Sequence, residues 1–324
     1  MKAAVIGANG FEIGEVAKPV PGPSQVLVRV RASGLNRADL IVASGRMHGN
    51  HGGPGTIVGL EFAGEVEAVG RDVPTGIKAG DRVMCSGSAG YAEYAVTDWG
   101  RVARIPANNM SFTQAATLPI ALQTMHDAIV TNGRLKAGES ILIQGASTGV
   151  GLMGLQIAKL MGAGLVMGSS TNAGRRARLA EFGADLAIDS SDAGWADQVI
   201  SATGGRGVDL IVDQISASVA NANMKAAAVR GRIVNVGRLG GTEGKFDFDL
   251  HAMKRIDYIG VTFRTRSVEE VREINRRMQA DLWPAVEAGK LSLPLDRTFP
   301  FTEAAAALAH MKANAHFGKI VLVQ

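Results

Sequence analysis

A single cysteine, Cys85, occurs in a chain of 324 residues, and aromatic residues make up only 5% of it. One thiol excludes an intrachain disulfide and any zinc site built from several thiolates. No apolar stretch approaches the ~20 uninterrupted residues that a membrane span requires. The first ten residues, MKAAVIGANG, contain no apolar core as long as that of a signal peptide. We therefore expect a cytoplasmic protein with no membrane partner.

The chain also has little excess of one charge over the other, since its formal net charge is only +4. The basic residues form no dense run, and the nearest approach to one is Arg175, Arg176 and Arg178. A nucleic-acid-binding protein normally concentrates its basic residues on one face or stripe. We therefore expect no nucleic-acid partner, and a mild basic excess suits a phosphate-bearing cofactor.

The first third of the chain is a series of short apolar segments separated by glycine turns. Val26 to Gly34 alternates apolar and charged residues, as a half-exposed strand does. Further strand segments are Ile57 to Gly70 and Gly80 to Met84. Many short strands with glycine turns predict a compact, largely β, barrel-like domain.

From about Ala115 the pattern changes to strands that alternate with helices. ESILIQGAS, GLVMGSS, DLAID, VDLIVDQI and RGRIVNVG read as strands, and GVGLMGLQIAKLMGA, RRARLAEFGA and NANMKAAAV as helices. This alternation predicts an α/β domain with a parallel sheet and right-handed crossovers. A charged helix over Val268 to Ala288, a short helix over Thr302 to Lys312 and a closing strand complete the chain.

The segment ILIQGASTGVG is the most informative one for function, because an apolar strand runs through small residues directly into a helix. Small residues let the backbone approach a pyrophosphate, whose charge is stabilised by the amides and dipole of the helix start. Against the G-x-G-x-x-G pattern the chain has Ala146, Thr148 and Gly151. The predicted pyrophosphate-binding residues are Ala146, Ser147, Thr148, Gly149, Val150 and Gly151.

The end of the next strand distinguishes the two nicotinamide cofactors. An acidic residue there would bind the adenosine ribose and repel a 2′-phosphate. This chain has Ser169 and Ser170 instead, and Arg175 and Arg176 follow before the first carboxylate, Glu181. Hydroxyl and guanidinium groups suit a phosphate, so we predict NADPH rather than NADH. The alternative is that the arginines form a solvated helix face.

Taken together, PGPSQVLVRVRASGLNRADL, GLEFAGEVEAVG, LPIALQTMHDA, GASTGVGLMGLQIAK and NAHFGKIVL resemble the medium-chain dehydrogenase/reductase superfamily, in order and over nearly the whole chain. Within it the chain looks like the zinc-free quinone oxidoreductases. The resemblance implies a GroES-like β-rich catalytic domain over residues 1–118 and 256–324. It also implies a Rossmann, doubly wound NADPH-binding domain over residues 119–255.

The zinc ligands of the related alcohol dehydrogenases are replaced in this chain. Asn36 stands where they carry a cysteine, and Leu60 stands where they carry the histidine of a G-H-E triplet. Neither side chain substitutes for a thiolate or an imidazole on zinc. The four-cysteine structural lobe is missing too, so we predict an enzyme with no metal.

The resemblance implies further site residues. It places Asn36 and Asp39 beside the nicotinamide as candidate catalytic residues. A tyrosine that related enoyl reductases carry a few residues later is replaced by Met47. The additional cofactor-binding residues that it implies are Thr124, Val236, Gly237, Arg238, Asn314 and Lys319.

These residues predict transfer of a hydride from NADPH to a quinone or an α,β-unsaturated carbonyl, the small-molecule substrate. Negative charge on the substrate oxygen needs a hydrogen-bond donor placed in advance, and Asn36 is our candidate. The alternative is that Asn36 only fixes its turn or holds the cofactor. Asp39 is either a general acid or an anchor for a helix start. Carbonyl or enoyl-thioester reduction, and NADPH binding without catalysis, are the competing functions. We expect a homodimer.

Overall fold

The computed structural model describes residues 1–7 and 10–324. The chain divides into two compact units. Unit 1 contains residues 1–120 and 263–324, and unit 2 contains residues 121–262. The expected second boundary, at residues 255 and 256, precedes a strand, β13 (Asp257–Gly260), that pairs with the sheet of unit 2. Unit 2 therefore continues to Thr262.

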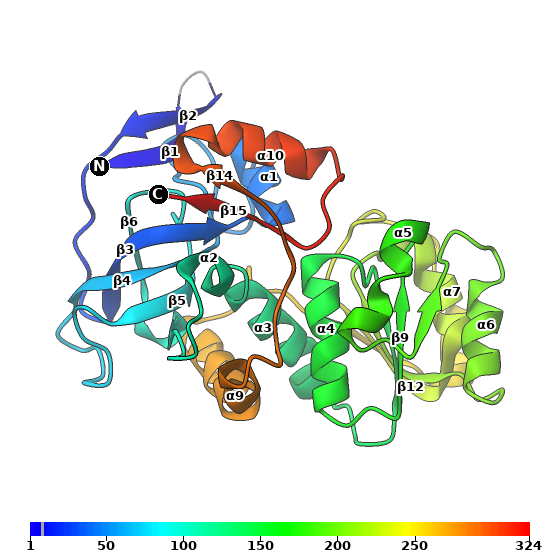
Figure 1. Ribbon diagram of the computed structural model, residues 1–324. Helices are drawn as coiled ribbons and strands as arrows, with labels where there is room; N and C mark the ends of the chain where they lie inside the picture. The colour runs from blue at the N-terminus through cyan, green and yellow to red at the C-terminus, as the bar shows by residue number, and fades with distance from the viewer. Residues whose placement is uncertain (8–9) are drawn as a thin grey trace. The chain divides into compact units, whose positions relative to one another are not determined.

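Unit 1 is built on a seven-stranded sheet with the order β14-β15-β3-β4-β5-β7, in which β6 also pairs with β3 (Figure 1). A separate antiparallel hairpin joins β1 and β2. The strands are β1 (Lys2–Gly7), β2 (Gly10–Glu15), β3 (Gln25–Gly34), β4 (Glu61–Val69), β5 (Arg82–Ser86), β6 (Tyr94–Asp98), β7 (Val102–Arg104), β14 (Leu295–Pro300) and β15 (Lys319–Val323). The predicted strand regions of the first third are confirmed as β3, β4 and β5.

Of the helices of unit 1, α2 and α10 pack on this sheet, whereas α1 packs on α10 and α9 on η1. They are α1 (Arg37–Ala43), η1 (Trp99–Arg101), α2 (Phe112–Ala115), α9 (Val268–Glu287), η5 (Phe301–Glu303) and α10 (Ala304–Lys312). The long helix α9 is capped by Ser267, whose hydroxyl accepts from Glu270 N at 3.1 Å as part of a capping box. A core under α10 contains Tyr91, Leu308 and Met311, and a second one contains Val28, Phe62 and Val83.

Unit 2 is a six-stranded parallel sheet with the order β10-β9-β8-β11-β12-β13. Its strands are β8 (Ser140–Gln144), β9 (Leu165–Ser169), β10 (Leu186–Ile188), β11 (Val208–Asp213), β12 (Ala227–Asn235) and β13. The order reverses between β8 and β11, so the strands run outward in both directions from this point. The predicted α/β fold with a doubly wound parallel sheet is confirmed.

Helices cover both faces of the sheet, with α4 on one side and α6 and α7 on the other (Figure 1). The helical segments are α3 (Pro119–His126), which begins in unit 1, the π-helix η2 (Asp127–Asn132), α4 (Gly149–Leu160), α5 (Ala173–Arg176), η3 (Leu179–Phe182), α6 (Trp195–Ala202), η4 (Ala217–Val219), α7 (Ala220–Ala226) and α8 (Phe248–Lys254). The single helix expected over RRARLAEFGA is divided into α5 and η3.

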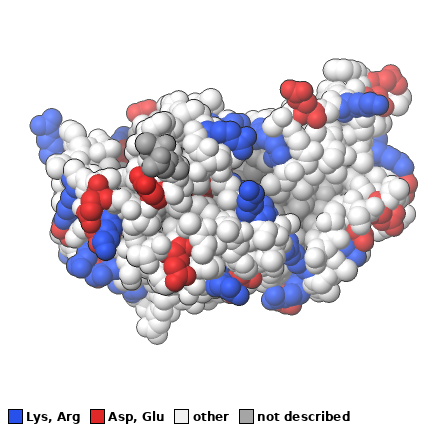
Figure 2. Space-filling view, turned by 90° about the horizontal axis from the view of Figure 1, so that it is seen from above, with Lys and Arg blue, Asp and Glu red and all other residues white. Residues whose placement is uncertain are grey.

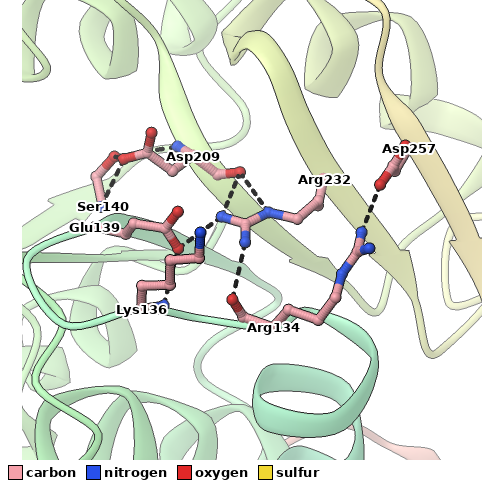
Figure 3. A network of polar contacts seen from close by, with 7 residues as sticks. All are labelled: Arg134, Lys136, Glu139, Ser140, Asp209, Arg232 and Asp257. Atoms are coloured by element: carbon pink, nitrogen blue, oxygen red, sulfur yellow. Dashed lines mark hydrogen bonds and ion pairs between the residues drawn. The ribbon is translucent and has the colours of Figure 1, made fainter.

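Polar side chains fasten the amino-terminal ends of the sheet strands (Figure 3). Asp209 of β11 accepts from the backbone N of Ser140 at 2.8 Å and from its hydroxyl at 2.6 Å. Arg232 of β12 donates to Glu139 at 2.7 Å and to the carbonyl of Arg134 at 2.9 Å. These contacts join three adjacent strands, β8, β11 and β12, near their amino-terminal ends. The site described below lies at the opposite edge of the sheet, where the carboxyl ends of the strands meet.

Within residues 1–7 and 10–324, no helix is both long and apolar enough to cross a bilayer. Lys and Arg side chains are interspersed with Asp and Glu on the face that Figure 2 shows.

Candidate functional site

The turn between β8 and α4 has the geometry that its small residues predict. Gly145 has a φ of +72°, in the left-handed region that glycine favours. Thr148 caps α4, because its Oγ1 accepts from Gly151 N at 2.9 Å. A Cβ on Gly151 would lie 2.6 Å from the carbonyl O of Gly145. Glycine at this position therefore allows the turn to close tightly on the helix start.

The turn leaves backbone donors for an anion. In a helix the first amides have no intrahelical acceptor, which applies here to Gly149 and Val150. Residues 147–150 are half-buried rather than enclosed. A helix of twelve residues adds its dipole at this end. The residues present therefore suit a pyrophosphate.

Two polar side chains that the sequence did not single out, Gln214 and Gln144, hold the turn together with the predicted Ser169. Gln214, after β11, accepts from Thr148 Oγ1 at 2.9 Å and donates to the carbonyl O of Gln144 at 3.1 Å. The Ser169 hydroxyl accepts from Gly145 N at 3.1 Å and donates to the side chain of Gln144. The end of β9 and the end of β11 thus both brace the turn.

The predicted 2′-phosphate residues lie at the same carboxyl-terminal edge. Ser170 Oγ lies 2.9 Å from Ser147 Oγ, which links the end of β9 to the turn. Arg175 and Arg176 follow on α5 and are half-buried. The structure also brings a carboxylate here that the sequence pattern did not predict, since Asp189 follows β10 and pairs with Arg176 at 2.9 Å.

The turn after β12 joins this edge through the backbone of Asp213. Its carbonyl accepts from Val236 N at 2.8 Å and from Gly237 N at 3.1 Å. A Cβ on Gly237 would lie 2.7 Å from Gln214 O, so this turn also packs closely. Arg238 folds back to donate to Val236 O at 3.1 Å. Thr124 lies half-buried on α3 in the same unit.

In unit 1, three strand ends bring Asn36, Glu61 and Lys319 together. Gly34, the last residue of β3, lies opposite Glu61 of β4, and β15 pairs with the same end of β3. Asn36 Nδ2 donates to Glu61 Oε1 at 2.9 Å, and Asn36 Oδ1 accepts from Lys319 Nζ at 3.1 Å. The amide of Asn36 is therefore held in one orientation.

Lys319 and Glu61 form a buried ion pair, with side chains 5% and 0% exposed. Lys319 Nζ also donates to the carbonyl O of Leu35 at 2.8 Å. Glu61 Oε2 accepts from Ile120 N at 2.9 Å. The structure thus places the Lys319 ammonium group, predicted to bind cofactor, among oxygen acceptors inside unit 1. Asn314, with a φ of +56°, lies after α10, where it accepts from Arg37.

Asp39 lies completely buried beside this cluster. Its Oδ2 accepts from Asn36 N at 2.7 Å and from the Tyr91 hydroxyl at 2.8 Å, which fastens the start of α1. Its Oδ1 has no hydrogen-bond partner among the described residues. Burial raises the pKa of the Asp39 carboxyl to about 7, although both hydrogen bonds oppose this shift.

Replacement of Asp39 by asparagine is expected to change how stability depends on pH. The folded pKa is raised above its unfolded value of 3.8, so the native state keeps a proton that the unfolded state releases. Wild-type stability therefore falls between about pH 4 and 7, by up to about 4 kcal/mol from this group. Over this pH range, the free energy of unfolding of Asp39→Asn, measured with urea, should rise relative to that of the wild type. A difference that stays constant with pH would contradict the buried, raised carboxyl.

Two sequence families match separate segments of the chain. Residues 149–280 match the zinc-binding dehydrogenase family, and residues 22–107 match the alcohol dehydrogenase GroES-like domain. Unit 1 is thus a GroES-like, β-rich unit and unit 2 a Rossmann unit, as predicted. This pairing defines a two-domain dehydrogenase.

Individual relatives place the chain more narrowly. The human quinone oxidoreductase is 31% identical over 312 residues, which cover 95% of this chain and 92% of that protein. Phthioceranic/hydroxyphthioceranic acid synthase of Mycobacterium tuberculosis is 32% identical over 316 residues, and the chain spans only 14% of its length. A mycobacterial protein solved in complex with NADPH is 25% identical, with a TM-score of 0.87 and full coverage of both chains. The chain belongs to the quinone oxidoreductase-like branch of the medium-chain dehydrogenase/reductase superfamily.

Proposed function

We propose that the protein is an NADPH-dependent, metal-independent reductase of quinones or α,β-unsaturated carbonyls. The observation that carries this proposal is the closed glycine turn at the start of α4, with Ser169, Ser170 and Arg175 at the same edge of the sheet. The NADPH held by a solved relative supports the choice of cofactor. Bound NADPH would supply the hydride.

The residues after β8 and β9 would bind the cofactor and orient it. Backbone amides of Ser147, Gly149 and Val150 would bind the pyrophosphate, and Gln214 keeps their turn in place through Thr148. Arg175 would bind the 2′-phosphate. Thr124, Val236, Gly237 and Arg238 would border the rest of the cofactor, and Asn314 would bind it from the tail of unit 1.

Asn36 would stabilise negative charge that develops on the substrate oxygen. Glu61 and Lys319 fix its amide, so that Nδ2 is the donor and Oδ1 the acceptor. Asn36 Nδ2 also donates to Gly34 O at 3.5 Å, a weak contact that a substrate oxygen would replace. Asp39 would support Asn36 by holding its backbone, rather than donate a proton itself. The proton then comes from water.

Replacement of the zinc ligands supports independence from metal. By the resemblance, Asn36 and Leu60 stand at two of the positions where the zinc-dependent relatives carry ligands. Cys85 is buried in β5, and burial raises the pKa of its thiol far above the usual range, so it is a poor ligand.

The purified protein is expected to oxidise NADPH when a small quinone or an enone is added, at a rate that a strong chelator leaves unchanged. Loss of NADPH absorbance measures the rate, and quenching of its fluorescence measures binding separately. A rate that chelator abolishes would contradict metal independence. Binding without turnover of any acceptor would instead support the competing role of a non-catalytic NADPH-binding protein.

A second candidate reaction is reduction of an enoyl thioester. It is favoured by the likeness to a segment of an acid synthase. Parallel assays with a quinone and an enoyl thioester distinguish the two substrate classes.

A homodimer is also part of the proposal, because the outer edge of β13 carries no pairing strand in the described chain and Phe248 beside it is 77% exposed. The molecular mass in solution tests this.

A further inference from the structure

An ion pair bridges two neighbouring strand ends at the proposed cofactor site. β9 and β10 are parallel, and Ile188 lies in register with Ser169. Asp189 directly follows β10, so its side chain reaches the edge where Ser170 and α5 lie. Arg176 donates from one terminal nitrogen to Ser170 O at 2.9 Å and pairs through the other with Asp189 Oδ2 at 2.9 Å. These side chains are 21% and 33% exposed, so solvent only partly screens the pair.

Hydrogen bonds also fix the Asp189 carboxylate in place, as they do the Arg176 guanidinium group. Its Oδ1 accepts from the hydroxyl of Ser191 and from Ser191 N at 3.0 Å. The Ser191 hydrogen bonds and the Arg176 charge lower the pKa of this carboxyl, so it is ionised at neutral pH. A permanent negative charge therefore lies next to the arginine pair of α5.

We propose that Asp189 is a specificity-determining residue, whose carboxylate neutralises Arg176 and weakens the preference of the site for NADPH over NADH. The inference rests on the proposed function. It assigns opposite effects to two residues that lie on adjacent segments, Arg175 favouring the 2′-phosphate and Asp189 opposing it.

The physical reason is competition for one guanidinium group. A 2′-phosphate that approaches Arg176 must share its donors with Asp189 and is repelled by that carboxylate. The neutral 2′-hydroxyl of NADH meets no such repulsion, and a carboxylate can accept its hydrogen bond. The acidic residue that usually follows the second strand is absent after β9, and Asp189 supplies a carboxylate from the adjacent strand instead.

The variant Asp189→Asn tests the proposal. The amide keeps an oxygen acceptor for Ser191 but removes the charge, which releases Arg176. A partly screened charge contact corresponds to a change of about 5-fold in affinity. Titrations of the whole protein with NADPH and with NADH, followed by nicotinamide fluorescence, should therefore show the ratio of the two dissociation constants shifting about 5-fold toward NADPH.

Asp185→Asn is the matched control. Asp185 precedes the same strand, β10, at its other end, where it pairs with Lys159 and accepts from Val166 N. It removes the same charge from unit 2, and the ratio should not change. In an Arg176→Gln background, Asp189→Asn should shift the ratio less, because no guanidinium is released.

Three results would overturn the inference. The first is an unchanged ratio in Asp189→Asn, whether both affinities stay the same or both weaken equally. The second is weaker binding of NADPH alone, and the third is tighter binding of NADH alone; either shifts the ratio toward NADH and would mean that Asp189 orients Arg176 for the phosphate. Failure of the wild-type protein to bind either nicotinamide is a different result, since it contradicts the proposed function itself.

Discussion

Replacement of Lys319 by methionine is expected to lower the free energy of unfolding by about 3–5 kcal/mol, the usual cost of breaking a buried ion pair. Glu61 would remain fully buried with a negative charge and only the Asn36 and Ile120 donors. Methionine retains much of the aliphatic length, so the loss measures the charge more than the packing. Urea unfolding of the variant and the wild type provides the comparison.

The double variant Glu61→Gln/Lys319→Met is the control. Glutamine keeps an oxygen acceptor for Ile120 N, and no buried charge remains unpaired. A neutral replacement of a buried pair is often tolerated, so the double variant should recover most of the loss. A single variant as stable as the wild type would mean that the pair does not stabilise unit 1.

The sequence predicts most of the strands and the long helices because their signals are local. The alternation of apolar and charged residues is enough to predict β3, and an apolar run is enough to predict β8. Small residues after that run predict the start of α4. The division of the helix expected over RRARLAEFGA into α5 and η3 was not predicted. In the structure Arg176, the last residue of α5, bonds to Ser170 O and to Asp189, and Asp189 lies thirteen residues further along the chain. No local pattern contains that contact.

The candidate site likewise contains residues that local motifs predict and residues that they do not. Asn36, Asp39 and the turn from Ala146 to Gly151 could be predicted as site residues because they stand inside recognisable motifs. Glu61 was not predicted as a site residue. Its contact with Asn36 depends on the pairing of β3 with β4 and on Gly34, where a Cβ would lie 2.7 Å from its carboxylate. Contacts of this kind depend on the register between paired strands, and the spacing of residues along the chain does not predict that register.

Gly151→Ala is expected to weaken NADPH binding by about 100-fold or more, a factor that corresponds to about 3 kcal/mol. The added Cβ would lie 2.6 Å from Gly145 O and 2.7 Å from Ala146 Cα. Both neighbours are backbone atoms of the turn, so the turn itself must move. The amides proposed to bind the pyrophosphate would move with it. Fluorescence titration with NADPH measures the effect.

Gly154→Ala, one turn further along α4, separates this effect from helix propensity. Its Cβ would lie 3.0 Å from the Met125 sulfur, the flexible part of a side chain that can adjust. Alanine in a helix interior is favoured over glycine by roughly 0.5–1 kcal/mol, so this variant should fold and bind NADPH as the wild type does. If Gly151→Ala also bound NADPH normally, the turn after β8 would not be the pyrophosphate site. The cofactor assignment would then lose its main structural support.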